Sequence, residues 1–190
     1  MSATKAVTAT FSINSYTVSY DGNGNTGGSA PSSVTQNYNT TFATSTGGTL
    51  TRTGYTLASW NTAANGSGTT YNLGANFTIT AAATLYAQWT INTYTVTYNG
   101  NSNTSGSVPV DASSPYNYNS NVTVKTNSGT LARTGYTFSG WNTAADGSGT
   151  DYAASGSATF AISANTILYA KWSINSYTVS YDGNGNTGGS

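Results

Sequence analysis

Few residues in this chain have side chains that could do acid–base or nucleophilic chemistry. His, Cys and Glu are absent from the 190 residues, which excludes imidazole, thiolate and glutamate catalysis and zinc sites built from Cys and His. Asp146 and Asp151 form the closest carboxylate pair and would suit the acid and nucleophile roles of a glycosidase. The residues 81 positions earlier are Asn65 and Thr70, so we interpret both aspartates as solvated turn residues. The sequence therefore predicts no catalytic residue and no enzyme activity.

The glycine-rich segment 21–27 is similar to two kinds of ligand loop and completes neither. Its glycines have the spacing of a dinucleotide-binding loop, Gly22-Asn-Gly24-Asn-Thr-Gly27, but no helical pattern follows them. Asp21, Asn23 and Asn25 match the first half of a calcium loop, but no Glu exists to close such a site. We expect a turn here, with no cofactor and no metal.

The chain is almost uncharged. Charged residues make up 5% of it, against roughly 25% in a typical soluble domain, and five Lys or Arg balance five Asp. Without a basic excess, binding to nucleic acid or to an anionic membrane surface loses its main electrostatic attraction. No apolar stretch approaches the roughly 20 residues of a membrane span, so we expect no nucleic acid partner and no direct membrane insertion by this segment. The 15 Tyr and 4 Trp can build a core, which predicts a folded chain.

The chain is a tandem repeat. The segment RTGYTLASWNTAANGSGT over residues 52–69 returns as RTGYTFSGWNTAADGSGT over residues 133–150, and TLYAQW over 84–89 returns as ILYAKW over 167–172. A strand-like start, SYTVSY or TYTVTY, opens at residues 15, 93 and 176, and residues 12–29 are identical to residues 173–190. We therefore predict an N-terminal flank over 1–14, repeat modules over 15–92 and 93–175, and the opening strand and loop of an unfinished third repeat over 176–190.

The basic side chains suggest two further hypotheses. Lys125 or Lys171 could supply the amine of an isopeptide cross-link to a nearby Asn, a reaction that a buried carboxylate usually promotes. Gln88 stands at the place of Lys171 in the first copy, and a mass lowered by one ammonia would reveal such a link. Arg52 and Arg133 each lie just before a Tyr, which predicts that the guanidinium stacks on an aromatic ring.

Local patterns predict strands in each module. Tyr16, Val18 and Tyr20 alternate with small polar residues, the period-two signature of a strand with one buried face. A second strand is expected from Val34 to Phe42, and a break in the alternation just before Trp60 predicts a bulge or a turn.

Turn signals complete this pattern. Asn65-Gly66 and Asp146-Gly147 are strong hairpin signals. Residues 71–77 and 153–160 could each hold a short helix or a turn, but no stretch sustains a helical apolar period over ten residues. We predict a mostly β fold of small tandem modules.

Aromatic residues supply the candidate core and the candidate ligand contacts. Six of them recur at matching places in the two modules and are predicted to form the cores: Trp60, Trp89, Trp141, Trp172, Tyr55 and Tyr136. Four others lie on the opposite strand face or in a polar loop, where exposed rings would suit the face of a sugar: Tyr86, Tyr169, Tyr116 and Tyr118. Outward tyrosines also serve ordinary protein contacts, so both interpretations stay open.

The repeated motifs resemble those of a known family. YTVTY, a Gly- and Asn-rich loop, RTGYTFSGWNTAADGSGT and LYAKW together resemble the Listeria–Bacteroides repeat family, also called internalin B-type repeats. The resemblance covers the chain from Tyr16 onward and departs from the family pattern at Leu57 and Ser59, where the first copy reads GYTLASW. It implies small β-grasp-like modules found in tandem in bacterial surface and secreted proteins, often adhesins, and it implies no catalytic residue.

The junctions between the copies are short. Only residues 90–93 separate Trp89 from Tyr94, with no Gly or Pro to add slack, so we expect neighbouring repeats to restrict each other and to form an elongated rod. The predicted function is a non-catalytic stalk or spacer of an extracellular protein, either on a bacterial cell surface or secreted. The alternative is an adhesive module that recognises a host glycan or surface protein through exposed aromatic residues.

Overall fold

The computed structural model describes residues 4–185 and 187–188, and the chain divides into two compact units, Met1–Asn92 and Thr93–Ser190. All regular elements of the described residues are strands. No helix of this part of the chain is long and apolar enough to cross a membrane. The prediction of a mostly β fold is therefore confirmed.

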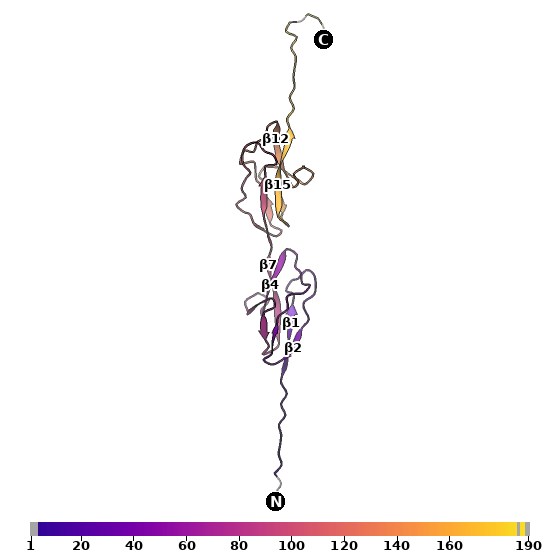
Figure 1. Ribbon diagram of the computed structural model, residues 1–190, viewed down its shortest axis with the longest axis vertical. Coiled ribbons are helices and arrows are strands. Elements are labelled where there is room, and N and C mark those ends of the chain that lie inside the picture. The colour runs from indigo at the N-terminus through magenta and orange to yellow at the C-terminus, as the bar shows by residue number, and fades with distance from the viewer. Residues whose placement is uncertain (1–3, 186, 189–190) are drawn as a thin grey trace. The chain divides into compact units, whose positions relative to one another are not determined.

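The first unit is built on a mixed five-stranded sheet with the order β2-β1-β7-β4-β5 (Figure 1). Its strands are β1 (Ser15–Asp21), β2 (Val34–Asn37), β4 (Tyr55–Asn61), β5 (Thr70–Asn72) and β7 (Ala83–Ile91). β1 runs parallel to β7, and the other neighbouring pairs of this sheet are antiparallel. A separate two-stranded sheet joins β3 (Thr41–Ala43) to β6 (Asn76–Thr78).

The second unit repeats this plan with a four-stranded sheet in the order β13-β12-β15-β9. Its strands are β9 (Val96–Asn99), β12 (Tyr136–Asn142), β13 (Asp151–Tyr152) and β15 (Thr166–Ile174), and β9 runs parallel to β15. Two small sheets join β11 (Asn121–Thr123) to β14 (Thr159–Ala161), and β8 (Thr93–Tyr94) to β10 (Tyr116–Asn117).

A proline explains why the β8–β10 pairing of the second unit is shorter than the β1–β2 pairing of the first. Thr35 of β2 pairs with Thr17, whereas the residue before Tyr116 is Pro115, which has no backbone N–H to donate to a ladder. The β8–β10 pair therefore stops after two residues. The backbone N–H of Val96 donates instead to Ser114 Oγ at 3.1 Å.

Each unit has its own hydrophobic core on one face of its main sheet. In β1, Val18 is fully buried whereas its neighbour Ser19 is exposed, as the alternating pattern predicts. Trp60 and Trp141 are the largest fully buried side chains of the two cores. Their indole N–H groups donate to backbone carbonyl groups at 2.6 and 2.9 Å, so burial of these rings leaves no donor without a partner.

The bulge predicted before the buried tryptophan is present in both units. The register of β4 against β7 shifts between Leu57 and Ser59, and that of β12 against β15 shifts between Phe138 and Gly140. The extra residue reverses the alternation. As a result Leu57 and Trp60, three positions apart, both pack into the core of the first unit.

The predicted single strand from Val34 to Phe42 is wrong, because this segment forms two strands, β2 and β3. Asn39, in the turn between them, has a positive φ of 65°, a conformation that Asn adopts more readily than most residues. Of the short helix or turn expected at residues 71–77 and 153–160, neither segment forms the helix. They hold turns together with parts of β5, β6 and β14.

Identical sequence takes two structures in this chain. SYTVSYD forms β1 over residues 15–21, where β2 and β7 flank it. Over residues 176–182 the same letters form no strand, and Tyr177, Val179 and Tyr181 are 82%, 74% and 95% exposed. The predicted opening strand of a third repeat is thus not formed at residues 176–182, and residues 186, 189 and 190 of that segment lie outside the described residues. No strand of the described residues pairs with 176–182, and pairing is what stabilises a strand.

The structure does not confirm the β-grasp-like arrangement that the resemblance implies. The main sheet of each unit is mixed, but no helix covers it within the part of the chain that the structure describes.

Candidate functional site

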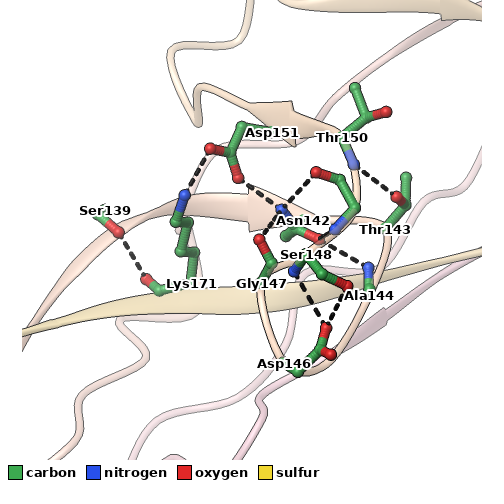
Figure 2. A network of polar contacts seen from close by, with 11 residues as sticks. Ser139, Asn142, Thr143, Ala144, Asp146, Gly147, Ser148, Thr150, Asp151 and Lys171 are labelled. Atoms are coloured by element: carbon green, nitrogen blue, oxygen red, sulfur yellow. Dashed lines mark hydrogen bonds and ion pairs between the residues drawn. The ribbon is translucent and has the colours of Figure 1, made fainter.

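Polar residues gather in the β12–β13 hairpin of the second unit, around the buried Asn142 (Figure 2). Asn142 Nδ2 donates to the carbonyl oxygens of Gly147 and Gly149, each at 3.2 Å, and to Asp151 Oδ1 at 2.6 Å. Its Oδ1 accepts the backbone N–H of Ala144 at 2.7 Å and that of Gly149 at 3.1 Å. One buried amide therefore holds the loop 143–150, which contains the predicted Asp146-Gly147 turn.

The two carboxylates of this hairpin each serve a local partner, and only Asp146 lies in the turn, because Asp151 is the first residue of β13. Asp146 Oδ1 accepts bonds from the hydroxyl and the backbone N–H of Ser148, at 2.7 and 3.0 Å, and these bonds lower the pKa of Asp146. Asp151 Oδ2 lies 2.5 Å from Lys171 Nζ, and the hydrogen bonds from Lys171 and Asn142 lower the pKa of Asp151. A glycosidase needs one carboxyl group with a raised pKa to act as general acid. In this pair the pKa values of both carboxyl groups are lowered.

The first unit builds the same loop with neutral residues. Asn61 takes the place of Asn142 and donates to the carbonyl oxygens of Gly66 and Gly68, each at 3.2 Å. Thr70 Oγ1 accepts the third bond at 2.9 Å, where Asp151 does so in the second unit. Because the loop forms without these charges, its polar network is an architectural feature of the repeat.

A second charged cluster surrounds Asp111, whose side chain is 1% exposed. Its Oδ1 accepts the backbone N–H of Ser113 at 3.1 Å and lies 3.1 Å from Lys125 Nζ. Its Oδ2 accepts the hydroxyl of Tyr116 at 2.8 Å. Burial, together with this bond to Asp111, raises the pKa of the Tyr116 hydroxyl. The buried carboxylate is thus compensated by three partners.

Sequence reasoning missed Asp111. The available signal was an insertion: the interval from Gly106 to Asn117 is two residues longer than the interval from Gly28 to Asn37 in the first unit. The longer loop carries Asp111, for which the first unit has no equivalent carboxylate. An insertion that brings a lone charge into one repeat is a reason to look for a compensating cation, here Lys125.

The amines considered for a Lys–Asn cross-link contact aspartates. Lys125 Nζ lies beside Asp111 and Lys171 Nζ beside Asp151, and no bond from either amine to an Asn side chain is seen among the described residues.

The four tryptophans predicted for the cores take two kinds of position. Trp60 and Trp141 are fully buried. Trp89 and Trp172 are half-buried and pack against the cores from the side. Their indole N–H groups donate to carbonyl groups of the glycine-rich loops, at 3.0 Å for Trp89 to Gly22.

Tyr55 and Tyr136 are half-buried and lie outside both core clusters. The guanidinium carbon of Arg52 lies 4.2 Å from the centre of the Tyr55 ring, and that of Arg133 lies 4.1 Å from the centre of the Tyr136 ring. The stacking prediction is confirmed, and each guanidinium group covers a half-buried ring at the surface.

The four tyrosines predicted as ligand contacts are all half-buried: Tyr86, Tyr169, Tyr116 and Tyr118. Tyr116 is engaged with Asp111, as described above. A hollow of about 220 Å³ lies beside the Asn142 loop, with Arg133, Asp146 and Trp172 in its wall. None of the four tyrosines lines this hollow.

The fold and these clusters define a tandem repeat protein of two homologous β-rich modules whose polar groups hold loops in place. The chain belongs to the Listeria-Bacteroides repeat domain family, which matches residues 16–88 and 94–171. The resemblance seen in the motifs is therefore confirmed.

Two relatives from Evansella cellulosilytica carry provisional names as membrane proteins. One, named a Gly-rich membrane protein, is 38% identical over 181 residues, which cover 90% of this chain and 20% of the relative. The other is 44% identical over 98 residues, which cover 51% of this chain and 14% of the relative. The chain thus spans a fifth or less of the length of the curated relatives it matches. No solved structure matches it.

Proposed function

We propose that this chain is a non-catalytic stalk or spacer segment of a bacterial cell-surface or secreted, adhesin-like protein. Tandem repeats of this family are typical of bacterial surface proteins, and the relatives are named as membrane proteins many times longer than one module. The engaged carboxylates with lowered pKa values support a structural role over an enzymatic one.

The observation that carries this proposal is that each module holds the residue after its last strand by two hydrogen bonds. Asn92 is the single residue between β7 and β8. Its backbone N–H donates to the carbonyl oxygen of Gly54 at 2.9 Å, and its Oδ1 accepts the Thr56 hydroxyl at 2.7 Å. The last residue of the first unit is therefore held by two hydrogen bonds, and the next residue, Thr93, already belongs to a strand of the second unit.

The end of the second unit has the same device. The backbone N–H of Asn175 donates to the carbonyl oxygen of Gly135 at 2.9 Å, and its Oδ1 accepts the Thr137 hydroxyl at 2.7 Å. A flexible tether would instead be rich in Gly and Ser. We infer that the junctions restrict the orientation of neighbouring repeats, which are each other's partners, and that the array extends as an elongated rod.

Small-angle X-ray scattering of the full chain tests this function. The matched control carries a ten-residue Gly-Ser insertion between Asn92 and Thr93. The proposal predicts that the native chain fits a narrow set of extended conformations and that the insertion broadens this set. Equal flexibility of the two proteins contradicts it. Retention of the chain on a glycan array would assign the adhesive function instead.

A further inference from the structure

The first and last strands of each main sheet are parallel neighbours. In the first unit, β1 pairs with β7 over four residues, Val18–Asp21 against Ala83–Tyr86. In the second unit, β9 pairs with β15 over four residues, Val96–Asn99 against Thr166–Tyr169. The strand that brings the chain into each sheet is thus hydrogen-bonded to the strand that takes it out.

This pairing decides how a module responds to tension along the chain. Ser15 begins β1 and Ile91 ends β7, and in a parallel pair these two points lie at opposite ends of the ladder. Tension pulls β1 and β7 past each other along their common axis. The ladder bonds are then loaded together, in shear, whereas strands pulled apart from the same end lose their bonds one at a time.

A side-chain lock extends this attachment beyond the four-residue ladder. Asn23, just after β1, donates from Nδ2 to the carbonyl oxygens of Ala64 and Ala87, each at 2.8 Å. Trp89 Nε1 donates to the carbonyl oxygen of Gly22 at 3.0 Å. Ala87 and Trp89 lie one and three residues beyond Tyr86, the last ladder partner on β7, so the loop after β1 is fastened to β7 past the end of the ladder.

The second unit has the same lock. Asn101 Nδ2 donates to the carbonyl oxygens of Ala145 and Ala170 at 2.8 and 2.9 Å, and Trp172 Nε1 donates to that of Gly100 at 3.2 Å. This lock gives a role to the Gly- and Asn-rich loop that neither a nucleotide nor a calcium site explains.

The turn that presents the locking amide is also the same in both units. Asp21 Oδ1 accepts the backbone N–H of Asn23 at 2.7 Å, and Asn99 Oδ1 accepts that of Asn101 at 2.8 Å. Both Asn23 and Asn101 have positive φ, 45° and 46°. Because Asn99 replaces Asp21 without changing the turn, the shared feature is an amide that ties strands and not a negative charge.

Sliding of β1 would also disturb the core. Val18 and Tyr20 are 0% and 9% exposed, and Val96 and Tyr98 of β9 are similarly buried. Displacing the strand along its axis breaks ladder bonds, lock bonds and core contacts in the same step. A high barrier to forced unfolding follows from this coincidence, because rupture under force is governed by the unfolding rate.

We propose that each repeat module is a mechanical clamp, in which the parallel terminal strands and the Asn–Trp lock bear tension applied along the chain. This inference rests on the proposed stalk function and specifies what that stalk withstands. The load would come from a partner bound beyond the array.

Single-molecule pulling in two directions tests the clamp on the full chain. The sequence contains no cysteine, so handles can be attached at introduced pairs. Ser15→Cys with Thr90→Cys pulls the ends of β1 and β7 in shear. Ser15→Cys with Ala82→Cys pulls the same end of the ladder and peels β1 away. The clamp predicts a several-fold higher rupture force for the first pair, and equal forces overturn it.

Two variants pulled in the shear direction test the lock. Asn23→Ala removes two hydrogen bonds and should raise the rupture rate at a given force roughly tenfold. The matched control, Asn25→Ala, also removes two side-chain hydrogen bonds from the glycine-rich loop, but these go to the carbonyl oxygens of Gly27 and Gly28 and none of them reaches β7. It should leave this rate nearly unchanged. An equal effect of the two variants overturns the lock, while the stalk function is judged separately by the scattering comparison.

Discussion

Replacing the buried Asn142 with Ala should selectively destabilise the second unit. Asn142 makes five hydrogen bonds through its side chain, and four of them go to backbone groups of the loop that it holds. The methyl side chain of Ala can make none of these hydrogen bonds. The loop carbonyl and N–H groups would have to turn towards water, which separates the loop from the end of β12.

The expected loss follows from these contacts. Each bond contributes about 0.5–1.5 kcal/mol net, and some of the released loop groups regain water. We therefore expect Asn142→Ala to lower the free energy of unfolding of the second unit by roughly 3–5 kcal/mol. Asn61→Ala should cause a similar loss in the first unit, because Asn61 makes the equivalent bonds.

Urea unfolding followed by NMR measures this loss in each unit separately. Each unit contains two tryptophans whose indole N–H signals report on that unit alone: Trp60 and Trp89, and Trp141 and Trp172. Asp146→Ala, on the exposed side of the same loop, is the matched control and should change the midpoint far less. An unchanged midpoint of the second unit in Asn142→Ala, or an equal shift of both units, would show that the Asn142 hydrogen bonds do not hold this unit.

Two further predictions concern the charged groups of the second unit. The pKa of Asp151 is lowered in the folded state by Lys171, so its contribution to stability is present above the ordinary carboxyl pKa of about 4 and is lost as the pH falls through the lowered value. Lys171→Gln, which copies Gln88 of the first unit, should reduce this acid sensitivity in urea unfolding; an unchanged pH dependence contradicts the assignment. Tyr116→Phe should lower the free energy of unfolding by about 1–3 kcal/mol, because Oδ2 of the buried Asp111 loses the hydroxyl that donates to it; a urea midpoint equal to that of the native protein contradicts this.

The sequence was sufficient to predict features that depend on local pattern. The alternation of Tyr16, Val18 and Tyr20 identified β1, and the break before Trp60 indicated a bulge or a turn, of which the structure has the bulge. The arginine stacks were also predictable, because Arg52 and Arg133 each lie three residues before a Tyr that begins a strand.

Features that depend on distant contacts were not predictable. Nothing in the residue type distinguishes the buried Asn142 from the many exposed asparagines, because its burial is created by the loop that closes over it. Asp111 is hidden for a similar reason, since an inserted loop brings it against Lys125 and Tyr116.

The identical segments show the same limit most directly. Residues 15–21 and 176–182 share every letter, but only the first forms a strand. The difference lies in β2 and β7, which supply backbone partners, and in the core that receives Val18. Local propensity favours a strand in both places, and tertiary contacts decide where one forms.

The claim that the modules form a restrained spacer is tested most directly by the distance distribution between two spin labels, one in each unit. Thr80→Cys and Ser128→Cys place the labels at exposed positions outside the strands. A restrained junction gives a narrow distribution that becomes broad when a Gly-Ser insertion follows Asn92. A distribution that is already broad in the native chain, and is unchanged by the insertion, would contradict it.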